Sequence, residues 1–125
     1  MGFGCECGYA WKGTLPETRQ HEGEYLTLIE REQWLEEASE AIASFVQASA
    51  SGLRDQWFDG TKYFNSQYPR DLPDGEVIHD LLFATRMDKG VDVYRCPQCR
   101  RVYIQEQQDT NWWLKYQYVE RNGTP

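Results

Sequence analysis

Four cysteines stand in two close pairs near opposite ends of this chain, and their spacing constrains the fold more than any other feature. One residue separates Cys5 from Cys7, and two residues separate Cys96 from Cys99. Two thiols this close in sequence can reach a common point from a single turn, so each pair predicts a short turn, or knuckle. The first knuckle covers residues 5–8. A common point for all four sulfur atoms would join the beginning of the chain to its end.

Four thiolates complete a tetrahedral coordination shell, which predicts a closed structural Zn²⁺ site. Its ligands are Cys5, Cys7, Cys96 and Cys99. Because protein ligands fill all four positions, we expect no open position for catalysis by the metal. Gly8 permits the tight backbone of the first knuckle. Three alternatives remain open, namely iron in a rubredoxin-like site, disulfides or free buried thiols, and a redox-active C-x-x-C pair.

Two helices are predicted between the knuckles. From about residue 30 to residue 49, apolar residues recur at three- and four-residue steps, which is typical of an amphipathic helix. Thr27 and Glu30 fit a capping box at its start. A second helix is expected over about residues 75–87, and Gly90 suits the position after its C-terminus.

Strand patterns surround the second knuckle, so a knuckle and hairpin are predicted over about residues 91–119, with a turn at residues 108–111. We therefore predict an α+β fold that forms a single domain over residues 1–125. Both chain ends would form a split zinc ribbon with an antiparallel β-hairpin, and the two helices would be an insertion packed on it. Because the metal would close a long loop, its binding is expected to contribute several kcal/mol to folding.

These motifs carry a resemblance to known proteins. The segments CECG and CPQCRRVYI and the amphipathic helix at Trp34 resemble a loose group of small bacterial proteins. The group has a C-x-C-G start and a late C-P-x-C-G-R-x-Y knuckle, and some of its members look like immunity proteins of contact-dependent or secreted toxin systems. Apart from that helix, the resemblance covers about a third of the chain, at its two ends. Arg100 stands where the group usually has glycine.

The charge of the chain is acidic and uneven. The formal net charge is −7, and residues 1–50 contain nine acidic residues against three basic ones. Nucleic acids are normally bound through a basic surface, so we expect no nucleic-acid ligand. The acidic half indicates either a solvated helix face or a surface that docks a cationic protein.

No catalytic constellation is recognisable, because the serines lack a nucleophile signature and His79 fits a core or edge position of the second helix. We therefore expect a non-catalytic protein-binding module. The resemblance implies an immunity protein that binds and neutralises a bacterial toxin, which would be basic. Trp and Tyr dominate interface hot spots, and charges speed encounter. The residues expected to contact the partner are Glu30, Glu37, Glu40, Trp57, Tyr63 and Trp113.

Two other functions remain open. Arg95, Arg100 and Arg101 beside the second knuckle would suit a zinc-ribbon nucleic-acid or transcription-associated factor. Residues 53–73 mix aromatic and turn residues without a clear period, and they could contain an unrecognised enzyme site. The chain start lacks the basic and apolar regions of a secretory signal, and no apolar run reaches the roughly 18 residues of a membrane span. We expect a cytoplasmic protein without a membrane partner.

Overall fold

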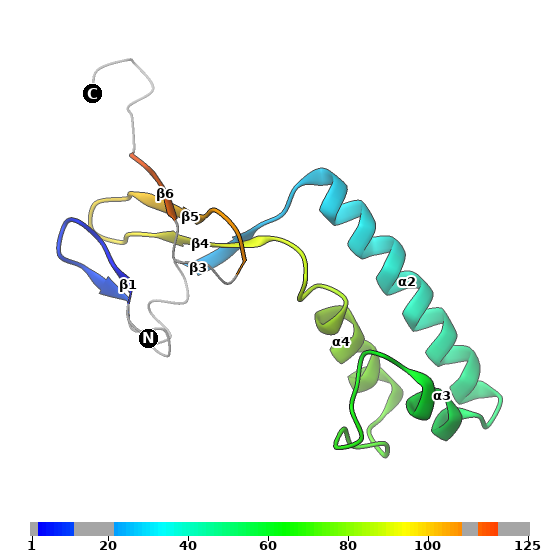
Figure 1. Cartoon of the computed structure of the whole chain (residues 1–125). Coiled ribbons are helices and arrows are strands. Elements are labelled where there is room, and N and C mark those ends of the chain that lie inside the picture. The colour runs from blue at the N-terminus through cyan, green and yellow to red at the C-terminus, as the bar shows by residue number, and fades with distance from the viewer. Residues whose placement is uncertain (1–2, 12–21, 109–112, 118–125) are drawn as a thin grey trace. The chain divides into compact units, whose positions relative to one another are not determined.

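The computed structural model describes residues 3–11, 22–108 and 113–117. Contacts divide the chain into two compact units, which are Met1–Leu26 with Gly90–Pro125 and Thr27–Lys89. We call them the sheet unit and the helical unit and describe each by itself (Figure 1). Helices and an antiparallel sheet together confirm the predicted α+β class. The single domain predicted over residues 1–125 stays a prediction, as does the zinc-ribbon form of the hairpin.

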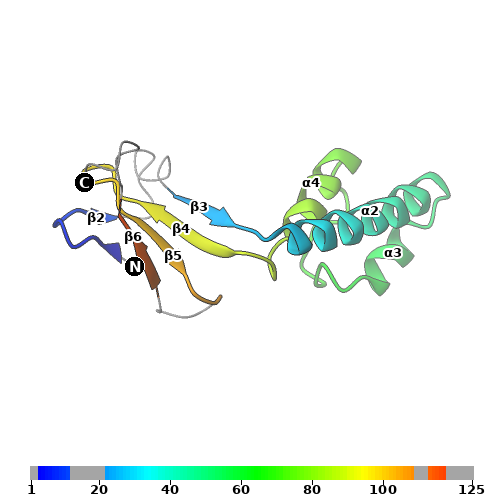
Figure 2. The ribbon, with the colours of Figure 1, turned by 90° about the horizontal axis from the view of Figure 1, so that it is seen from above.

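Antiparallel strands build the sheet unit (Figures 1 and 2). The main sheet has the order β3-β4-β5-β6 and consists of β3 (Glu22–Tyr25), β4 (Val91–Arg95), β5 (Val102–Gln105) and β6 (Trp113–Tyr116). A separate hairpin pairs β1 (Phe3–Gly4) with β2 (Ala10–Trp11). The first knuckle lies between β1 and β2, and the second lies between β4 and β5. Residues 109–111 of the predicted turn and residues 112, 118 and 119 of the predicted hairpin lie outside the described residues.

The register of the main sheet gives it two different faces. Residues directly opposite each other on paired strands point to the same face. One cross-strand row consists of Tyr94, Tyr103 and Lys115, and the adjacent row on the opposite face consists of Arg95, Val102 and Tyr116. Tyr103 is 7% exposed and packs with Cys5 and Cys96 in a small core of the sheet unit. The first face is therefore the one that meets the cysteines.

Three helices form the helical unit. They are α2 (Leu28–Ala50), α3 (Arg54–Gly60) and α4 (Asp74–Ala84). Helix α2 begins at the predicted capping box, in which the hydroxyl of Thr27 accepts from the backbone N–H of Glu30 at 3.1 Å. The Glu30 carboxylate in turn accepts from the backbone N–H of Thr27 at 3.2 Å. None of the helices in the described part of the chain combines the length and the apolar character that crossing a membrane would require.

Aromatic residues supply much of the core of the helical unit. Its buried residues are Ala41, Phe45, Phe58, Val77 and Leu81. The ring of Phe45 meets the rings of Trp57 and Phe58 edge-on, with centroid distances of 5.0 and 6.0 Å. Phe58 and Trp57 belong to α3, so the stretch at residues 53–73 that had no clear sequence period contributes aromatic side chains to this core. Edge-to-face contacts of this kind stabilise beyond the area they bury.

Candidate metal centre

The four cysteine sulfur atoms lie together in the sheet unit, where the turn of the β1–β2 hairpin meets the turn that joins β4 to β5. All four lie within 4.8 Å of one another. The Cys5 and Cys99 sulfurs are 3.5 Å apart, as are the Cys7 and Cys96 sulfurs. Sulfurs at about 2.3 Å from one tetrahedral ion would be about 3.8 Å from each other. The spacing therefore suits a single metal ion held by all four cysteines.

All four thiols are free. The closest sulfur–sulfur distances far exceed the length of a disulfide bond, which is about 2.05 Å. Each of these two 3.5 Å contacts joins one thiol of the first knuckle to one of the second. The cluster therefore links the beginning of the chain to its end, as the cysteine spacing predicted.

The first knuckle is a tight turn closed by its own backbone. The N–H of Cys5 donates to the carbonyl of Tyr9 at 2.8 Å, and the N–H of Gly8 donates to the carbonyl of Cys5 at 3.0 Å. Gly8 has a φ of 101°, which side-chain-bearing residues rarely adopt. Glu6, which lies between the two cysteines, forms an ion pair of 2.5 Å with Lys115 on β6. The turn is thus attached to the main sheet.

The second knuckle is equally tight, although it lacks the glycine of the resembling group. The N–H of Cys96 donates to the carbonyl of Arg101 at 2.8 Å, and the N–H of Arg100 donates to the carbonyl of Cys96 at 2.9 Å. Arg100 has a φ of 65°, in the left-handed region that glycine favours. An arginine in this conformation costs about 1–2 kcal/mol. The turn therefore keeps its shape at a conformational cost.

Polar groups around the cluster donate to its sulfur atoms. The hydroxyl of Tyr103 donates to the Cys5 sulfur at 3.3 Å, and Nη1 of Arg101 donates to the Cys99 sulfur at 3.5 Å. The backbone N–H of Glu6 donates to the Tyr103 hydroxyl at 3.2 Å and orients it. Donors of this kind favour the thiolate form and offset the charge of metal-bound sulfur.

The cysteines differ in how readily they ionise. Burial raises the pKa of Cys5, but hydrogen bonds from Tyr103 and from neighbouring groups lower it to about 6. A hydrogen bond from the backbone of Tyr9 lowers the pKa of Cys7, but loss of hydration and the other thiols raise it to about 12. Four negative charges cannot share so small a volume without a cation. A divalent ion would supply the missing positive charge, and its binding would release protons.

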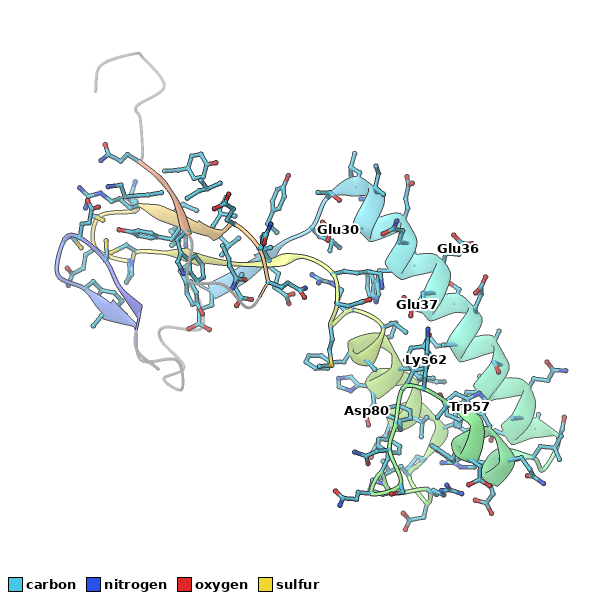
Figure 3. All side chains as sticks on the ribbon, in the orientation of Figure 1. Glu30, Glu36, Glu37, Trp57, Lys62 and Asp80 are labelled. Atoms are coloured by element: carbon cyan, nitrogen blue, oxygen red, sulfur yellow. The ribbon has the colours of Figure 1, made fainter. Side chains whose placement is uncertain are left out.

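Glu37 and Tyr63, two of the residues predicted to contact a partner, bind each other within the helical unit. The Tyr63 hydroxyl donates to one Glu37 oxygen at 2.9 Å, and Lys89 Nζ lies 2.6 Å from the other. Lys89 is only 8% exposed. Glu37 lies on the side of α2 that faces the other helices, whereas Glu36 points away from them (Figure 3). Glu37 is therefore part of an internal polar network.

The other residues predicted to contact a partner differ in exposure. Glu30 belongs to the capping box, and Trp57 is half-buried with its Nε1 donating to the Ser44 hydroxyl at 3.0 Å. Trp113 is half-buried beside Tyr94 in the sheet unit, with their ring centroids 5.3 Å apart. Glu40 is exposed. His79, expected at a core or edge position, has an exposed side chain beside Asp80.

Glu32, Glu36 and Glu40 form an acidic stripe on α2 that the sequence analysis missed in part. All three are exposed, and none forms an ion pair with another residue in the described part of the chain. Their spacing of four residues places them on one face of a helix. That spacing was visible in the sequence, but the residues expected to contact a partner included Glu37 and left out Glu32 and Glu36.

Comparison with protein families matches nearly the whole chain to a family model. The model of a family described as a domain of unknown function, DUF8617, matches residues 1–122. No curated protein and no solved structure matches the chain. The family match includes both knuckles and the whole helical unit.

Proposed function

The chain belongs to the DUF8617 family, and we propose that this member is a non-catalytic protein-binding module held together by a structural zinc ion. The observation that carries this proposal is the four-thiol cluster. Its ligands come from both chain ends, and four cysteines would fill every coordination position of a tetrahedral ion, so none would remain for a substrate or a water molecule. The ion would neutralise the thiolates of Cys5, Cys7, Cys96 and Cys99. Its role would be to fasten the β1–β2 hairpin to the main sheet.

Zinc is favoured over iron by the spacing of the first pair. One residue separates Cys5 from Cys7, whereas rubredoxin-like iron sites have two residues within each pair. Tetrahedral four-thiolate sites are typical of structural zinc. We place the protein in the cytoplasm, where a reducing environment keeps thiols available for a metal.

Elemental analysis of protein purified under reducing conditions without added metal tests this part of the proposal. We expect about one zinc ion per chain and loss of zinc in the Cys96→Ser and Cys99→Ser variants, because each removes one of four ligands. His79→Ala is the control, since this exposed side chain belongs to the helical unit. Iron in place of zinc, or no metal at all, would contradict the proposal.

The proposed partner is a cationic bacterial toxin, which the protein would neutralise as an immunity protein. The resemblance of both knuckles to such proteins supports this role, and the acidic stripe supports a basic partner. Exposed apolar side chains of the helical unit also suit a protein interface. They include Leu28, Ile29, Phe83 and Met87, which are 67–69% exposed.

Co-expression with a toxin encoded beside the gene for this chain tests the partner. We expect growth to be rescued, and we expect the purified proteins to associate more weakly as salt is added, because screening weakens charge attraction. Glu36→Lys should slow association, whereas Glu106→Lys, the same change at an exposed site of the sheet unit, should not. Absence of both rescue and association would reject the immunity role.

A further inference from the structure

Helix α2 has a second line of apolar residues besides the one that builds the core. Leu28, Leu35, Ile42 and Val46 follow one another at steps of seven, seven and four residues. At about 3.6 residues per turn these steps are close to whole turns, so the four residues lie along one side of the helix. Leu28 is 68% exposed, Leu35 49% and Val46 44%, whereas Ile42 is partly buried against the core. We call these four residues the outer row.

The outer row lies between the buried side of α2 and the acidic stripe. It is about a quarter of a turn round the helix from the buried Ala38, Ala41 and Phe45. On its other side, about a quarter of a turn further, is the acidic stripe, whose Glu36 points away from the other helices (Figure 3). Single exposed apolar residues are normal, but several in one line mark a surface that another protein can cover.

The spacing of the outer row suits an α-helix as its partner. A row that repeats every seven residues drifts only about 20° per repeat, so a second helix crossing at about 20° can follow it. An extended segment presents side chains on one face about every 6.6 Å, which does not match row steps of about 10.5 Å. From Leu28 to Val46 the row is roughly 27 Å long, which a helix of about 18 residues would cover.

Charge decides which helix fits. Helix α2 contains five glutamates and a single basic residue, Arg31. Glu32, Glu36 and Glu40 are exposed and form no ion pair within the part of the chain that the structure describes. A helix lying on the outer row would meet these carboxylates along one edge, which favours lysine or arginine there. A second copy of α2 would offer almost no complementary charge.

We infer that the outer row docks an amphipathic helix of the partner protein, with apolar residues against the row and basic residues beside the acidic stripe. Recognition of this kind uses anchors spaced by whole turns of the bound helix. The inference rests on the proposed protein-binding role and assigns a docking surface and a secondary structure to it. Buried apolar anchors would supply most of the affinity, and the charges would speed encounter and fix the orientation.

Synthetic peptides of about 18 residues test the inference. The basic probe has leucine at the first and fourth positions of each seven-residue repeat, lysine at the flanking positions and alanine elsewhere. The acidic probe has glutamate in place of lysine, and the scrambled probe keeps the composition of the basic probe without the repeat. Fluorescence anisotropy of the labelled peptides measures binding to the full-length protein with added zinc. We expect the basic probe to bind about tenfold or more tightly than either of the others, because only it offers both an apolar row and complementary charge.

Variants locate the binding site of the basic probe. Leu35→Gln and Val46→Gln should each weaken its binding about tenfold, because each removes an apolar contact while glutamine still favours helix. Leu114→Gln is the matched control, since Leu114 is 47% exposed and belongs to the sheet unit. Glu32→Gln should slow association and make it less sensitive to salt, whereas Glu106→Gln, the same change at an exposed site of the sheet unit, should not.

Three results would overturn the inference. One is equal binding of the basic and scrambled probes, and another is binding that stays unchanged in both Leu35→Gln and Val46→Gln. The third is a dimer in analytical ultracentrifugation that Leu35→Gln dissociates, which would assign the outer row to a second copy of this chain. These results concern the docking surface alone, because co-expression with the toxin tests the immunity role separately.

Discussion

At the scale of single residues, the two knuckles satisfy the same backbone requirement with opposite choices. Each contains a residue in the left-handed region, which is Gly8 in the first knuckle and Arg100 in the second. Glycine adopts this region without strain, whereas arginine does not. No atom lies within 4 Å of a methyl group built on Gly8, so only the backbone conformation restricts this position.

Substitutions at these two positions should shift stability in opposite directions. Gly8→Ala should lower the free energy of unfolding by about 1–2 kcal/mol, because it forces a side chain into the left-handed region. Arg100→Gly should raise it by up to about 1 kcal/mol, since the relief of strain exceeds the added freedom of the unfolded chain. Urea unfolding of the metal-loaded protein measures both changes.

Gly75→Ala in the first turn of α4 is the matched control for Gly8→Ala. A methyl group there also meets nothing within 4 Å, and Gly75 has no positive φ. Because alanine favours helix over glycine, this variant should be neutral or slightly stabilising. Equal destabilisation by Gly75→Ala and Gly8→Ala would show that the knuckle conformation is not the cause.

At the scale of elements, polar contacts connect α2 to α4 and to the residues that follow α4. Trp34 Nε1 on α2 lies 3.1 Å from both the carbonyl of Leu82 and the hydroxyl of Thr85. Glu37, one turn further along α2, meets Lys89, whose Nζ also donates to the carbonyl of Thr85 at 2.8 Å. Removing one partner of a buried ion pair lowers the stability of the fold, because the other charge stays buried without compensation.

Glu37→Gln should therefore destabilise the helical unit by about 1–2 kcal/mol at neutral pH, because it removes the closer of the two carboxylates that pair with the Lys89 ammonium and leaves only the exposed Asp88. The exposed Glu36 provides the matched control, and Glu36→Gln should have an effect close to zero. Thermal unfolding followed by circular dichroism measures the difference. Similar destabilisation by both variants would mean that the Glu37–Lys89 pair contributes nothing specific.

The destabilisation caused by Glu37→Gln should depend on pH, because the pKa values of both Glu37 and Lys89 are shifted in the folded protein. The hydrogen bond from Lys89 holds the pKa of Glu37 below its ordinary value of 4.5. Although burial lowers the pKa of Lys89, hydrogen bonds to Glu37 and Asp88 raise it above 10.5. The ionised Glu37 thus contributes fully to the free energy of unfolding above pH 4.5, and this contribution is lost as the pH falls through the lowered pKa of Glu37. The difference in unfolding temperature between the unsubstituted protein and the Glu37→Gln variant should therefore disappear at acidic pH.

At the scale of the whole molecule, the cysteine cluster and the hydrophobic core belong to different compact units. The cluster lies in the sheet unit, whereas Phe45, Val77 and Leu81, which are fully buried, lie in the helical unit. Metal binding adds its free energy to the folding of the part that it crosslinks. The helical unit has a core of its own that contains no cysteine.

Removing the proposed metal with a strong chelator under reducing conditions should therefore unfold the sheet unit and leave most of the helical signal. Hydrogen exchange measures this directly, because amides of β4 and β5 should lose protection while those of α2 keep theirs. Adding zinc back should restore protection. Simultaneous loss of protection in both units would instead support one cooperative domain over residues 1–125.

Short-range patterns determined what the sequence by itself could show. The cysteine pairs, the Thr27–Glu30 capping box and the apolar period of α2 depend on residues within one turn of each other, so local geometry is sufficient to interpret them. For the same reason residues 53–73 stayed ambiguous, because the aromatic core at Phe58 forms only when α3 packs against α2 and α4.

Only the tertiary structure decided which charged residues are engaged and which remain at the surface. Glu36 and Glu37 are adjacent and chemically identical, but Lys89, distant in sequence, pairs with Glu37 and not with Glu36. The row of Arg95, Val102 and Tyr116 likewise exists only because strand register places three separated residues side by side. Such pairings depend on contacts between distant parts of the chain, and no local pattern of residues encodes them.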